Sequence, residues 1–244
     1  MQVLEKLQFE TREQEAIYEY VERNGTATPE ELQTEFALEP SRLRETIDSL
    51  IEEEFLDEGD GHLRIAIDTG IETNYTTDDL TFAIRPAEQG DLRGLVGVMR
   101  NVAEQNDYLV AETVVDLLDH EEVVFRHNDI ESRIFFVATV DDDVVGWVQL
   151  RAPNYEKLAH TAELTIGVLE AYRGHGIGSH LMERGLEWAS SNGYEKVYQS
   201  LPATNQDAVR FLEEHRWETE AIRQAHYKID GEYVAEQMMG VMLG

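Results

Sequence analysis

The sequence predicts a mixed protein of the α+β/α/β class, with a mostly antiparallel sheet flanked by helices and a small helical unit in front of it. Two observations carry this prediction. Between residues 81 and 244, strand-like and helix-like runs follow one another in the order β-α-α-β-β-β-α-β-α-β-β. Before residue 69, three runs with helix-start signals precede one strand pair. We therefore expect two domains, residues 1–68 and 81–244, joined by a linker over residues 69–80.

The first unit shows clear start signals for its helices. Thr11 with Gln14 forms a capping-box pattern, and the helix that it opens is expected to end at about residue 24. The run TPEE at residues 28–31 opens a second helix, with proline at the first helical position. A third helix is expected from residue 40 or 41, where apolar residues recur at helical spacing. Residues 55–67 alternate like a hairpin that turns at Asp60-Gly61.

The presence or absence of helical and strand periodicity also separates the linker from the second unit. Residues 69–80, TGIETNYTTDDL, are polar and lack helical or strand periodicity. In the second unit we expect strands at residues 82–85, 133–140, 144–150, 162–169 and 196–201, helices at 91–105, 114–126, 176–191 and 206–214, and a closing hairpin of 217–229 with 233–243. Helices would therefore lie between strands and cover the sheet.

The run Arg173-Gly174-His175-Gly176-Ile177-Gly178 is the most specific signal in the chain. It follows the apolar stretch 164–169 and opens the helical stretch that continues from Ser179. Glycines let a backbone approach a ligand closely, and the first N–H groups of a helix favour an anion. The spacing R-x-x-G-x-G matches neither the dinucleotide-binding pattern nor the Walker pattern. We therefore predict a cradle for a pyrophosphate, of a third class.

The stretch AELTIGVLEAYRGHGIGSHLMERGLEWASSNG, residues 162–193, resembles the central motif of the GNAT superfamily of acetyl-CoA-dependent N-acetyltransferases. In that family a strand ending in a bulge precedes the pattern [QR]-x-x-G-x-[GA] and a helix. The resemblance extends from about Thr81 to Gly244, and the order of elements predicted above is similar to that of the family. It implies a GNAT-type sheet flanked by helices and the transfer of an acetyl group to an amine.

The resemblance also implies which residues contact acetyl-CoA. The parted strand before the loop would hold the pantetheine arm, and the N–H of Val168 would polarise the thioester carbonyl, an effect worth about 10²-fold or more. The loop amides would bind the diphosphate. Asn205, with Ala208 in the pattern N-x-x-A, is similar to the family's second cofactor contact. The cofactor-binding residues expected in this way are Ile166, Gly167, Val168, Arg173, Gly174, His175, Gly176, Ile177, Gly178, Ser179 and Asn205.

Acetyl transfer also needs a base, because an amine with a pKa of about 10.4 is almost fully protonated at neutral pH. Glu163 lies on the strand where such enzymes often carry a glutamate and is the preferred candidate, with His160 as an alternative. The family's usual proton donor is a tyrosine four residues after the position of Ala208, and here that residue is Leu212. Three possibilities stay open: Tyr227 donates the proton, the thiolate leaves unassisted, or catalysis is weak or lost.

The charge of the chain is strongly negative. The formal net charge is −30, with 50 acidic against 20 basic side chains, and only four of the basic residues are lysines. A disordered acidic chain would have few apolar residues, whereas this one is 42% hydrophobic with clear periodicity. We therefore expect a folded protein with a carboxylate-covered surface. Such a surface suits molar salt, so we expect the source to be an extreme halophile.

Several classes of site are excluded by composition. Cysteine is absent, which excludes disulfides, thiolate metal sites and a cysteine nucleophile. The eight histidines show no zinc-binding spacing, so no metal is expected. The chain has no run of 18 apolar residues and no signal-peptide core near its start. We therefore expect a soluble, cytoplasmic protein without a membrane partner.

Three helices followed by a hairpin resemble a winged helix-turn-helix, a topology that often binds DNA. Arg42 and Arg44, at the start of the third helix, could reach a groove. Residues 1–80, however, carry 6 basic and 22 acidic side chains, so DNA should be repelled in ordinary buffer. A structural or dimerising role for the first domain is the alternative to DNA binding.

The leading hypothesis is an N-acetyltransferase that moves an acetyl group from acetyl-CoA to a small-molecule primary amine by direct attack. The closing segment HYKIDGEYVAEQMMGVML resembles that of members which acetylate polyamines or amino acids. The first alternative is a DNA-binding regulator whose second domain senses acetyl-CoA or modifies a partner. The second is an acyl-CoA-binding protein without catalysis. The identity of the amine, the partner of the first domain and a possible homodimer stay open.

Overall fold

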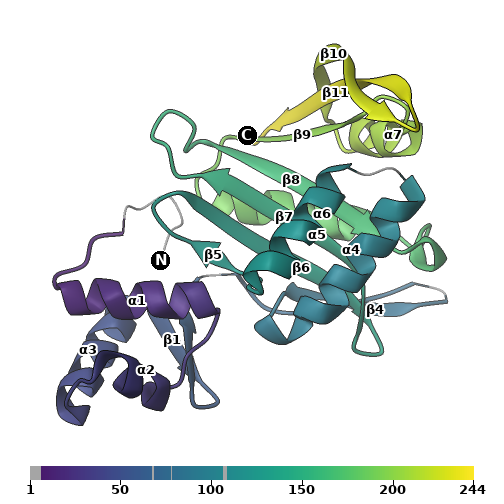
Figure 1. Cartoon of the computed structure of the whole chain (residues 1–244). Coiled ribbons are helices and arrows are strands. Elements are labelled where there is room, and N and C mark those ends of the chain that lie inside the picture. Colours follow the sequence, from purple (N-terminus) through teal and green to yellow (C-terminus); the bar gives the residue numbers. More distant parts are fainter. Residues whose placement is uncertain (1–6, 68, 78, 107–108) are drawn as a thin grey trace.

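The computed structural model describes residues 7–67, 69–77, 79–106 and 109–244, and the side chains among them outside residues 105–111. It has two parts: an N-terminal group of helices with a small hairpin, and a long twisted sheet covered by helices (Figure 1). The two parts contact each other where the first helix lies beside the short strand at residues 126–127.

The N-terminal part contains three helices and a hairpin. They are α1 (Arg12–Asn24), α2 (Pro29–Phe36), α3 (Pro40–Glu52), β1 (Leu56–Gly59) and β2 (His62–Ile65). Both predicted capping boxes are present, since Thr11 and Thr28 each exchange hydrogen bonds with the third residue of their helix. The apolar stripes of the helices and the hairpin share one core, which includes Ile17, Leu32 and Leu50. The predicted order of elements is confirmed, while the likeness to a winged helix stays a prediction.

The second part is built on one sheet, which has nine strands among the described residues. They are β3 (Thr73–Thr76), β4 (Thr81–Pro86), β5 (Arg126–His127), β6 (Glu131–Val140), β7 (Asp143–Pro153), β8 (Thr161–Val168), β9 (Lys196–Pro202), β10 (Glu218–Ile229) and β11 (Glu232–Met242). Their order is β10-β11-β9-β8-β7-β6-β4-β3, and β5 pairs with β6. Only β8 and β9 are parallel neighbours, so the sheet is mixed and mostly antiparallel, as predicted.

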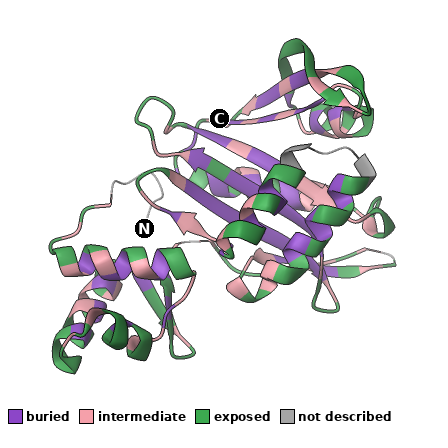
Figure 2. Ribbon diagram, viewed as in Figure 1, coloured by how far each residue is buried: buried purple, intermediate pink, exposed green. Residues whose placement is uncertain are grey.

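Helices cover both faces of this sheet. Helices α4 (Leu92–Asn106) and α5 (Leu109–Glu121) cross the face in front in Figure 1, and α6 (Ile177–Ser191) lies behind it. The short helix α7 (Gln206–Glu214) lies with β9 and the β10–β11 hairpin at one end. Alternate strand residues serve the two layers: Trp147 belongs to the core under α4 and α5, and Val148 to the core under α6. The central strands are therefore buried, whereas β10 is largely exposed (Figure 2).

Two details differ from the sequence prediction. Residues 73–76, expected within an irregular linker, form the edge strand β3, which pairs with β4. Thr73 and Tyr75 are half-buried there, and the ring of Tyr75 lies 5.2 Å from that of Phe82 and 4.1 Å from that of His180. An edge strand of this kind needs few apolar residues, so the polar sequence of residues 73–76 gave no strand pattern that could predict β3. The helix expected at residues 114–126 is wrong at both ends, since α5 begins at Leu109 and ends at Glu121. It ends there because Glu122 turns the chain with a positive φ of 57°, and Arg126 belongs to the strand β5.

Candidate active site

The two parallel strands β8 and β9 part in the middle of the sheet. They pair over only three residues, from Thr161 with Lys196 to Glu163 with Tyr198. Beyond this point β8 continues to pair with β7 as far as Val168, and β9 with β11 as far as Pro202. The facing edges of β8 and β9 therefore have unpaired backbone groups and leave a cleft between them.

The amides that face the cleft follow from the register of β8. The N–H of Leu169 donates to the carbonyl oxygen of Val145 at 2.9 Å, on the β7 side. Successive N–H groups of a strand point to opposite edges, so those of Val168 and Ile166 point toward the cleft. The side chain of Arg173 reaches the same point, where its Nε donates to the carbonyl oxygen of Val168 at 2.9 Å. The cleft edge thus carries two free amides close to the glycine-rich loop.

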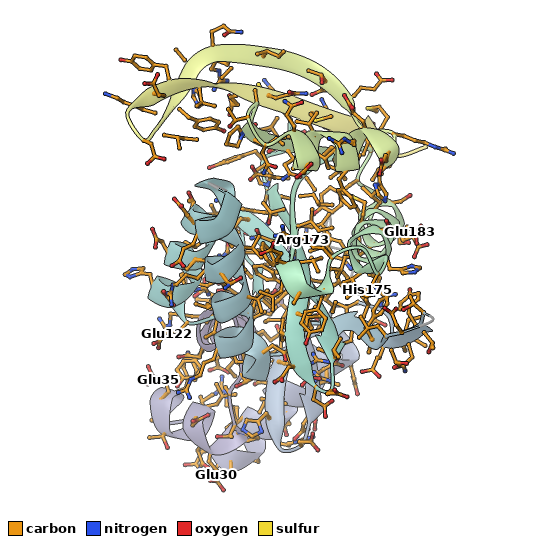
Figure 3. All side chains as sticks on the ribbon, turned by 90° about the vertical axis from the view of Figure 1, so that its right-hand side faces the viewer. Glu30, Glu35, Glu122, Arg173, His175 and Glu183 are labelled. Atoms are coloured by element: carbon orange, nitrogen blue, oxygen red, sulfur yellow. The ribbon has the colours of Figure 1, made fainter. Side chains whose placement is uncertain are left out.

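A pocket of about 460 Å³ occupies this cleft. Apolar side chains line one part of it, and the glycine-rich loop lines another. The lining residues are Val102, Ile166, Gly167, Val168, Arg173, Gly174, Gly176, Gly178, Ser179, Gln199, Asn205, Asp207, Ala208, Phe211 and Leu212. Figure 3 looks toward the loop, with Arg173 and His175 labelled near the start of α6. Apolar side chains and the backbone amides of the glycine-rich loop therefore line the same pocket.

The loop itself fits a diphosphate. Gly174 and Gly176 have φ angles of +83° and +81°, which residues with side chains rarely adopt. A Cβ at Gly174 would point into open space, and one at Gly176 would be in ordinary contact with the ring of His180, at 3.9 Å. Gly176 is the N-cap of α6, and no side chain caps that helix. The first amides of a helix have no partner within it, so they and the helix dipole are free to bind an anion.

Nine of the eleven predicted cofactor residues line the pocket, and two do not. Ile177 is buried in the core under α6. The ring of His175 lies on the outside of the loop, where its Nδ1 is 3.2 Å from a carboxylate oxygen of Asp79. Both residues can still contribute a backbone amide to the loop.

Some lining residues were not singled out from the sequence. Val102 comes from α4, Gln199 from β9, and Phe211 from α7, so elements far apart in the chain supply them. No local pattern marks them. For Phe211 a signal did exist, since it comes one residue before Leu212, where the family places its tyrosine. Leu212 lines the pocket and is buried in the core, so no hydroxyl is available at that position.

Asn205 has a structural task as well as a place in the pocket. Its side-chain oxygen accepts a hydrogen bond from the N–H of Ala208 at 3.2 Å and so caps α7. The pattern N-x-x-A therefore has a local cause, because the cap fixes the start of the helix beside the cleft. The amide nitrogen of the side chain remains available to a ligand in the pocket.

Glu163, the preferred base, lies at the point where β8 and β9 part. It is half-buried, opposite Arg151 of β7 on one side and Tyr198 of β9 on the other. Burial raises the pKa of Glu163 above its usual range, and the positive charge of Arg151 opposes part of this rise. His160, the alternative base, is exposed in the loop before β8 and does not line the pocket. Glu163 does not line the pocket either, but it lies at the point where β8 and β9 part, whereas His160 lies before the segment over which the two strands pair.

Tyr227, the candidate proton donor, comes from the irregular part of β10. The register of β10 against β11 shifts between Arg223 and Tyr227, and Ala225 has a positive φ of 52°. The hydroxyl of Tyr227 donates to a carboxylate oxygen of the buried Glu236 at 3.2 Å. Burial, followed by the charge of Glu236, raises the pKa of Tyr227 to about 12. Its proton is therefore held tightly at neutral pH.

The two arginines that could reach a DNA groove, Arg42 and Arg44, are both engaged in ion pairs. Arg42 contacts Glu13 at 2.8 Å, and Arg44 contacts Asp48 at 2.9 Å and Glu58 at 3.0 Å. All of these pairs are at least partly exposed, so they are weak. DNA binding by the N-terminal part stays a prediction.

Comparison with known proteins agrees with the geometry of the cleft. Residues 102–216 match the model of the Acetyltransferase (GNAT) family. The chain contains a GNAT acetyltransferase domain. It is an enzyme of the acyltransferase class.

Relatives of this GNAT domain carry the names of N-acetyltransferases. YwnH of Bacillus subtilis, which bears the name of a phosphinothricin acetyltransferase, is 26% identical over 137 residues, which are 54% of this chain and 81% of YwnH. An N-alpha-acetyltransferase of Sulfurisphaera tokodaii is 33% identical over 111 residues, 40% of this chain and 64% of that protein. These relatives have differently named substrates, so they do not identify the acceptor of this GNAT domain.

Solved structures share the fold of the GNAT domain. An acetyltransferase of Streptococcus pneumoniae superposes with a TM-score of 0.56 at 23% identity, covering 66% of this chain and 99% of its own. The yncA protein of Salmonella typhimurium, solved with its cofactor acetyl-CoA, gives 0.54 at 16% identity, covering 67% of this chain and 94% of its own. Each match leaves about a third of this chain uncovered.

Two further findings concern only the part of the chain that the structure describes. No group of three or more histidine, aspartate or glutamate side chains is arranged there to hold a metal ion. None of the helices in that part has the length and apolar character needed to cross a membrane.

Proposed function

We propose that this protein transfers an acetyl group from acetyl-CoA to a primary amine of a small molecule. The observation that carries the proposal is the pocket between β8 and β9, which joins free strand amides to the glycine-rich start of α6. When bound, acetyl-CoA would supply the acetyl group as a reactive thioester. The residues of the chain would hold it, orient the amine and accept the proton.

The cleft offers a separate contact for each part of the cofactor. Amides of residues 174–179 would bind the diphosphate, since they gather at an uncapped helix N-terminus. The cleft-facing backbone of Ile166 and Val168 would pair with the pantetheine arm, and the apolar wall of Phe211 and Leu212 would cover it. An amide at the cleft edge, for which Val168 is our candidate, would stabilise the developing oxyanion.

Glu163 would take up the proton of the amine. Glu163 lies five positions before Val168, about 16 Å along an extended strand, so we expect the proton to travel through a chain of waters rather than directly. Burial favours a neutral glutamic acid, which makes the carboxylate a stronger base than an exposed one. The raised pKa also means that activity should be lost as pH falls through it, because only the ionised form accepts a proton.

The departing thiolate has no tyrosine at position 212 to protonate it. Tyr227 is the remaining hydroxyl candidate, but its proton is shared with Glu236 and its pKa of about 12 makes it a weak acid. A thiol ionises at a pKa of about 8.5, well below the pKa of Tyr227. The thiolate of coenzyme A can therefore leave without an acid from the protein and take its proton from water. We therefore expect Tyr227→Phe to retain most of its activity.

The cradle is tested by binding. In Gly176→Glu a carboxylate would occupy the place of the diphosphate, and we expect calorimetry to show no binding of coenzyme A. Gly61→Glu is the matched control, since Gly61 also has a positive φ and open space but lies in the distant hairpin of the N-terminal part. Unchanged affinity in Gly176→Glu would refute the cradle.

Catalysis is tested by thiol release from acetyl-CoA over a panel of amines in high salt. The panel should contain polyamines, amino acids and a peptide with a free N-terminus. We expect turnover of a small amine, and Glu163→Gln should lower kcat by about 10²- to 10⁴-fold without changing the affinity for coenzyme A. Saturable binding without turnover of any amine would mean that the protein only binds acyl-CoA.

A further inference from the structure

A straight row of charged residues crosses the sheet and ends at Glu163. In the register of the strands, Arg126 of β5 lies opposite Arg133 of β6, and Arg133 lies opposite Arg151 of β7. Arg151 in turn lies opposite Glu163 of β8. Three arginines on three successive strands therefore lead to the candidate base. Like charges directly opposite each other destabilise a sheet, so this row needs compensation.

Carboxylates placed between the arginines provide that compensation. Glu121, at the end of α5, contacts Arg126 at 3.1 Å and Arg133 at 2.6 Å. Glu131 contacts Arg133 at 3.7 Å and Arg151 at 2.7 Å. The two glutamates thus join the three arginines into one chain of alternating charges.

The N-terminal part closes this chain at its far end. Glu22 of α1 contacts Arg126 at 3.0 Å, and its side chain is only 8% exposed. Arg126 is 12% exposed and Arg133 is completely buried, so these charges are held by their partners in a largely dry setting. Arg151 differs, because its side chain is 49% exposed. It is the one arginine of the row that would move freely in water without an anchor.

We propose that Arg151, anchored by Glu131, is a positioning residue for Glu163: it holds a positive charge beside the carboxylate at the point where β8 and β9 part. This inference rests on the proposed role of Glu163 as the base. The charged and titratable groups that face Glu163 among the described residues are Arg151 from β7, Tyr198 from β9 and Tyr227 from β10. The described parts of α4 and α5, which cover this face, pack mainly apolar side chains on it.

The arrangement resolves a conflict at the base. Burial alone drives Glu163 toward the neutral form, which cannot accept a proton, and neither tyrosine offers a positive charge. Arg151 is the cation opposite Glu163, and it lowers the pKa of that carboxyl. Glu131 already holds the guanidinium of Arg151 through a 2.7 Å hydrogen bond. The long side chain of Arg151 therefore does not have to lose conformational entropy each time it acts on Glu163. The base can therefore be both half-buried and ionised.

The test compares pH profiles of kcat/KM for Arg151→Gln, Arg151→Lys and wild type. We expect the acid limb to move upward by about 0.5 to 1 pH unit in Arg151→Gln and to return most of the way in Arg151→Lys. The KM for acetyl-CoA should not change, because Arg151 does not line the pocket. Arg42→Gln is the control: it also removes one exposed, ion-paired arginine, but in the N-terminal part. Its profile should coincide with that of wild type.

A second readout separates this inference from the proposed reaction. The pKa of Glu163 is measured by NMR with ¹³C-labelled glutamate, and its signal is assigned by its absence in Glu163→Gln. We expect the pKa to rise in Arg151→Gln, and an unmoved pKa would overturn the inference. If the pKa rises while Glu163→Gln keeps full activity, Arg151 does act on Glu163, but Glu163 is not the base.

Discussion

Gly167 shows how one residue can be required by packing and by the site together. A Cβ at this position would come within 2.2 Å of the buried ring of Trp147. Trp147 lies opposite Gly167 on β7, so its ring covers the place where a side chain would stand. The backbone of β8 is thereby held beside the pocket with no side chain in the way. The glycine that the family pattern marks as a cofactor contact therefore has a second cause inside the core.

We predict that Gly167→Ala destabilises the protein by about 1–3 kcal/mol, because the ring of Trp147 must move to admit the methyl group. It should also weaken binding of coenzyme A, since the cleft edge shifts with the ring. Thermal unfolding and calorimetry measure the two effects. Gly97→Ala is the control, since Gly97 is exposed on α4 with no atom near its Cβ position, and alanine there should stabilise the helix slightly. Equal unfolding temperatures for Gly167→Ala and wild type would contradict the prediction.

His127 is a buried titratable residue at the junction of the two parts. Its Nδ1 is 2.8 Å from the hydroxyl of Ser132, and its carbonyl oxygen accepts a hydrogen bond from Tyr18 of α1. Burial lowers the pKa of His127 to about 4. The folded protein therefore keeps this histidine neutral at pH values where an unfolded chain, with a pKa of about 6.5, would bind a proton.

The sign of the resulting pH dependence follows from proton binding. Between pH 6.5 and pH 4 the unfolded state binds more protons at this residue, so its contribution to stability is lost as pH falls through that range. We predict that wild type loses up to about 3 kcal/mol through His127 in this window. Denaturant unfolding of wild type and His127→Gln at pH 7 and pH 4.5 measures the difference. If both proteins lose equal stability, His127 is not the cause.

At the scale of elements, the contact between α1 and β5 joins the two parts of the chain. Arg126 donates to the side chain and to the carbonyl oxygen of Glu22, and Asn128 donates to the other carboxylate oxygen of Glu22. A buried ion pair of this kind adds little net stability over apolar residues, but breaking one half of it is costly. The junction should therefore tolerate replacement of both charges better than loss of one.

We predict that Arg126→Met lowers the free energy of unfolding by about 3 kcal/mol, because it leaves Glu22 buried without its cation. Adding Glu22→Gln should recover part of this loss. Denaturant unfolding of the two single variants and the double variant forms a complete cycle. Additive effects would show that the pair is not coupled. The exposed pair of Arg100 with Asp119 is the control, and removing it should cost less than about 1 kcal/mol.

At the scale of the whole molecule, the net charge of −30 dominates the surface. The folded chain brings 50 carboxylates close together, with only 20 arginines and lysines to balance them. Repulsion among these charges destabilises the compact state, and salt weakens it by shortening the distance over which charges interact. In the arginine row, the positive charges form ion pairs with largely buried carboxylates of the same row. These arginines therefore do not balance the carboxylates on the surface, which stays acidic.

We predict that the unfolding temperature rises steadily between 0.1 M and 3 M KCl. The physical reason is that the Debye length falls from about 10 Å to below about 3 Å over this range. Calorimetry over a salt series measures the effect. Sucrose at equal osmolality is the control, since it strengthens apolar burial without screening charge. An unfolding temperature that falls or stays level in KCl would count against adaptation to high salt.

Local sequence patterns predicted much of the fold and part of the candidate site. Capping boxes, glycine spacing and periodicity are properties of neighbouring residues, so they predicted the order of elements and the loop at residues 173–178. The strand β3 was missed because an edge strand can be polar, and only pairing with β4 reveals it. The end of α5 was misplaced because a positive φ at Glu122 leaves no mark in the periodicity.

Contacts between distant residues required the folded chain. Val102, Gln199 and Phe211 meet in one pocket only because three separate elements converge at the parting of β8 and β9. The row from Arg126 to Glu163 exists only in the register of four strands, and a slip of one residue would move each side chain to the other face. The sequence sufficed to predict which chemistry the chain can carry out, because a loop motif is local. Register and packing, which are not local, selected the residues that surround that chemistry.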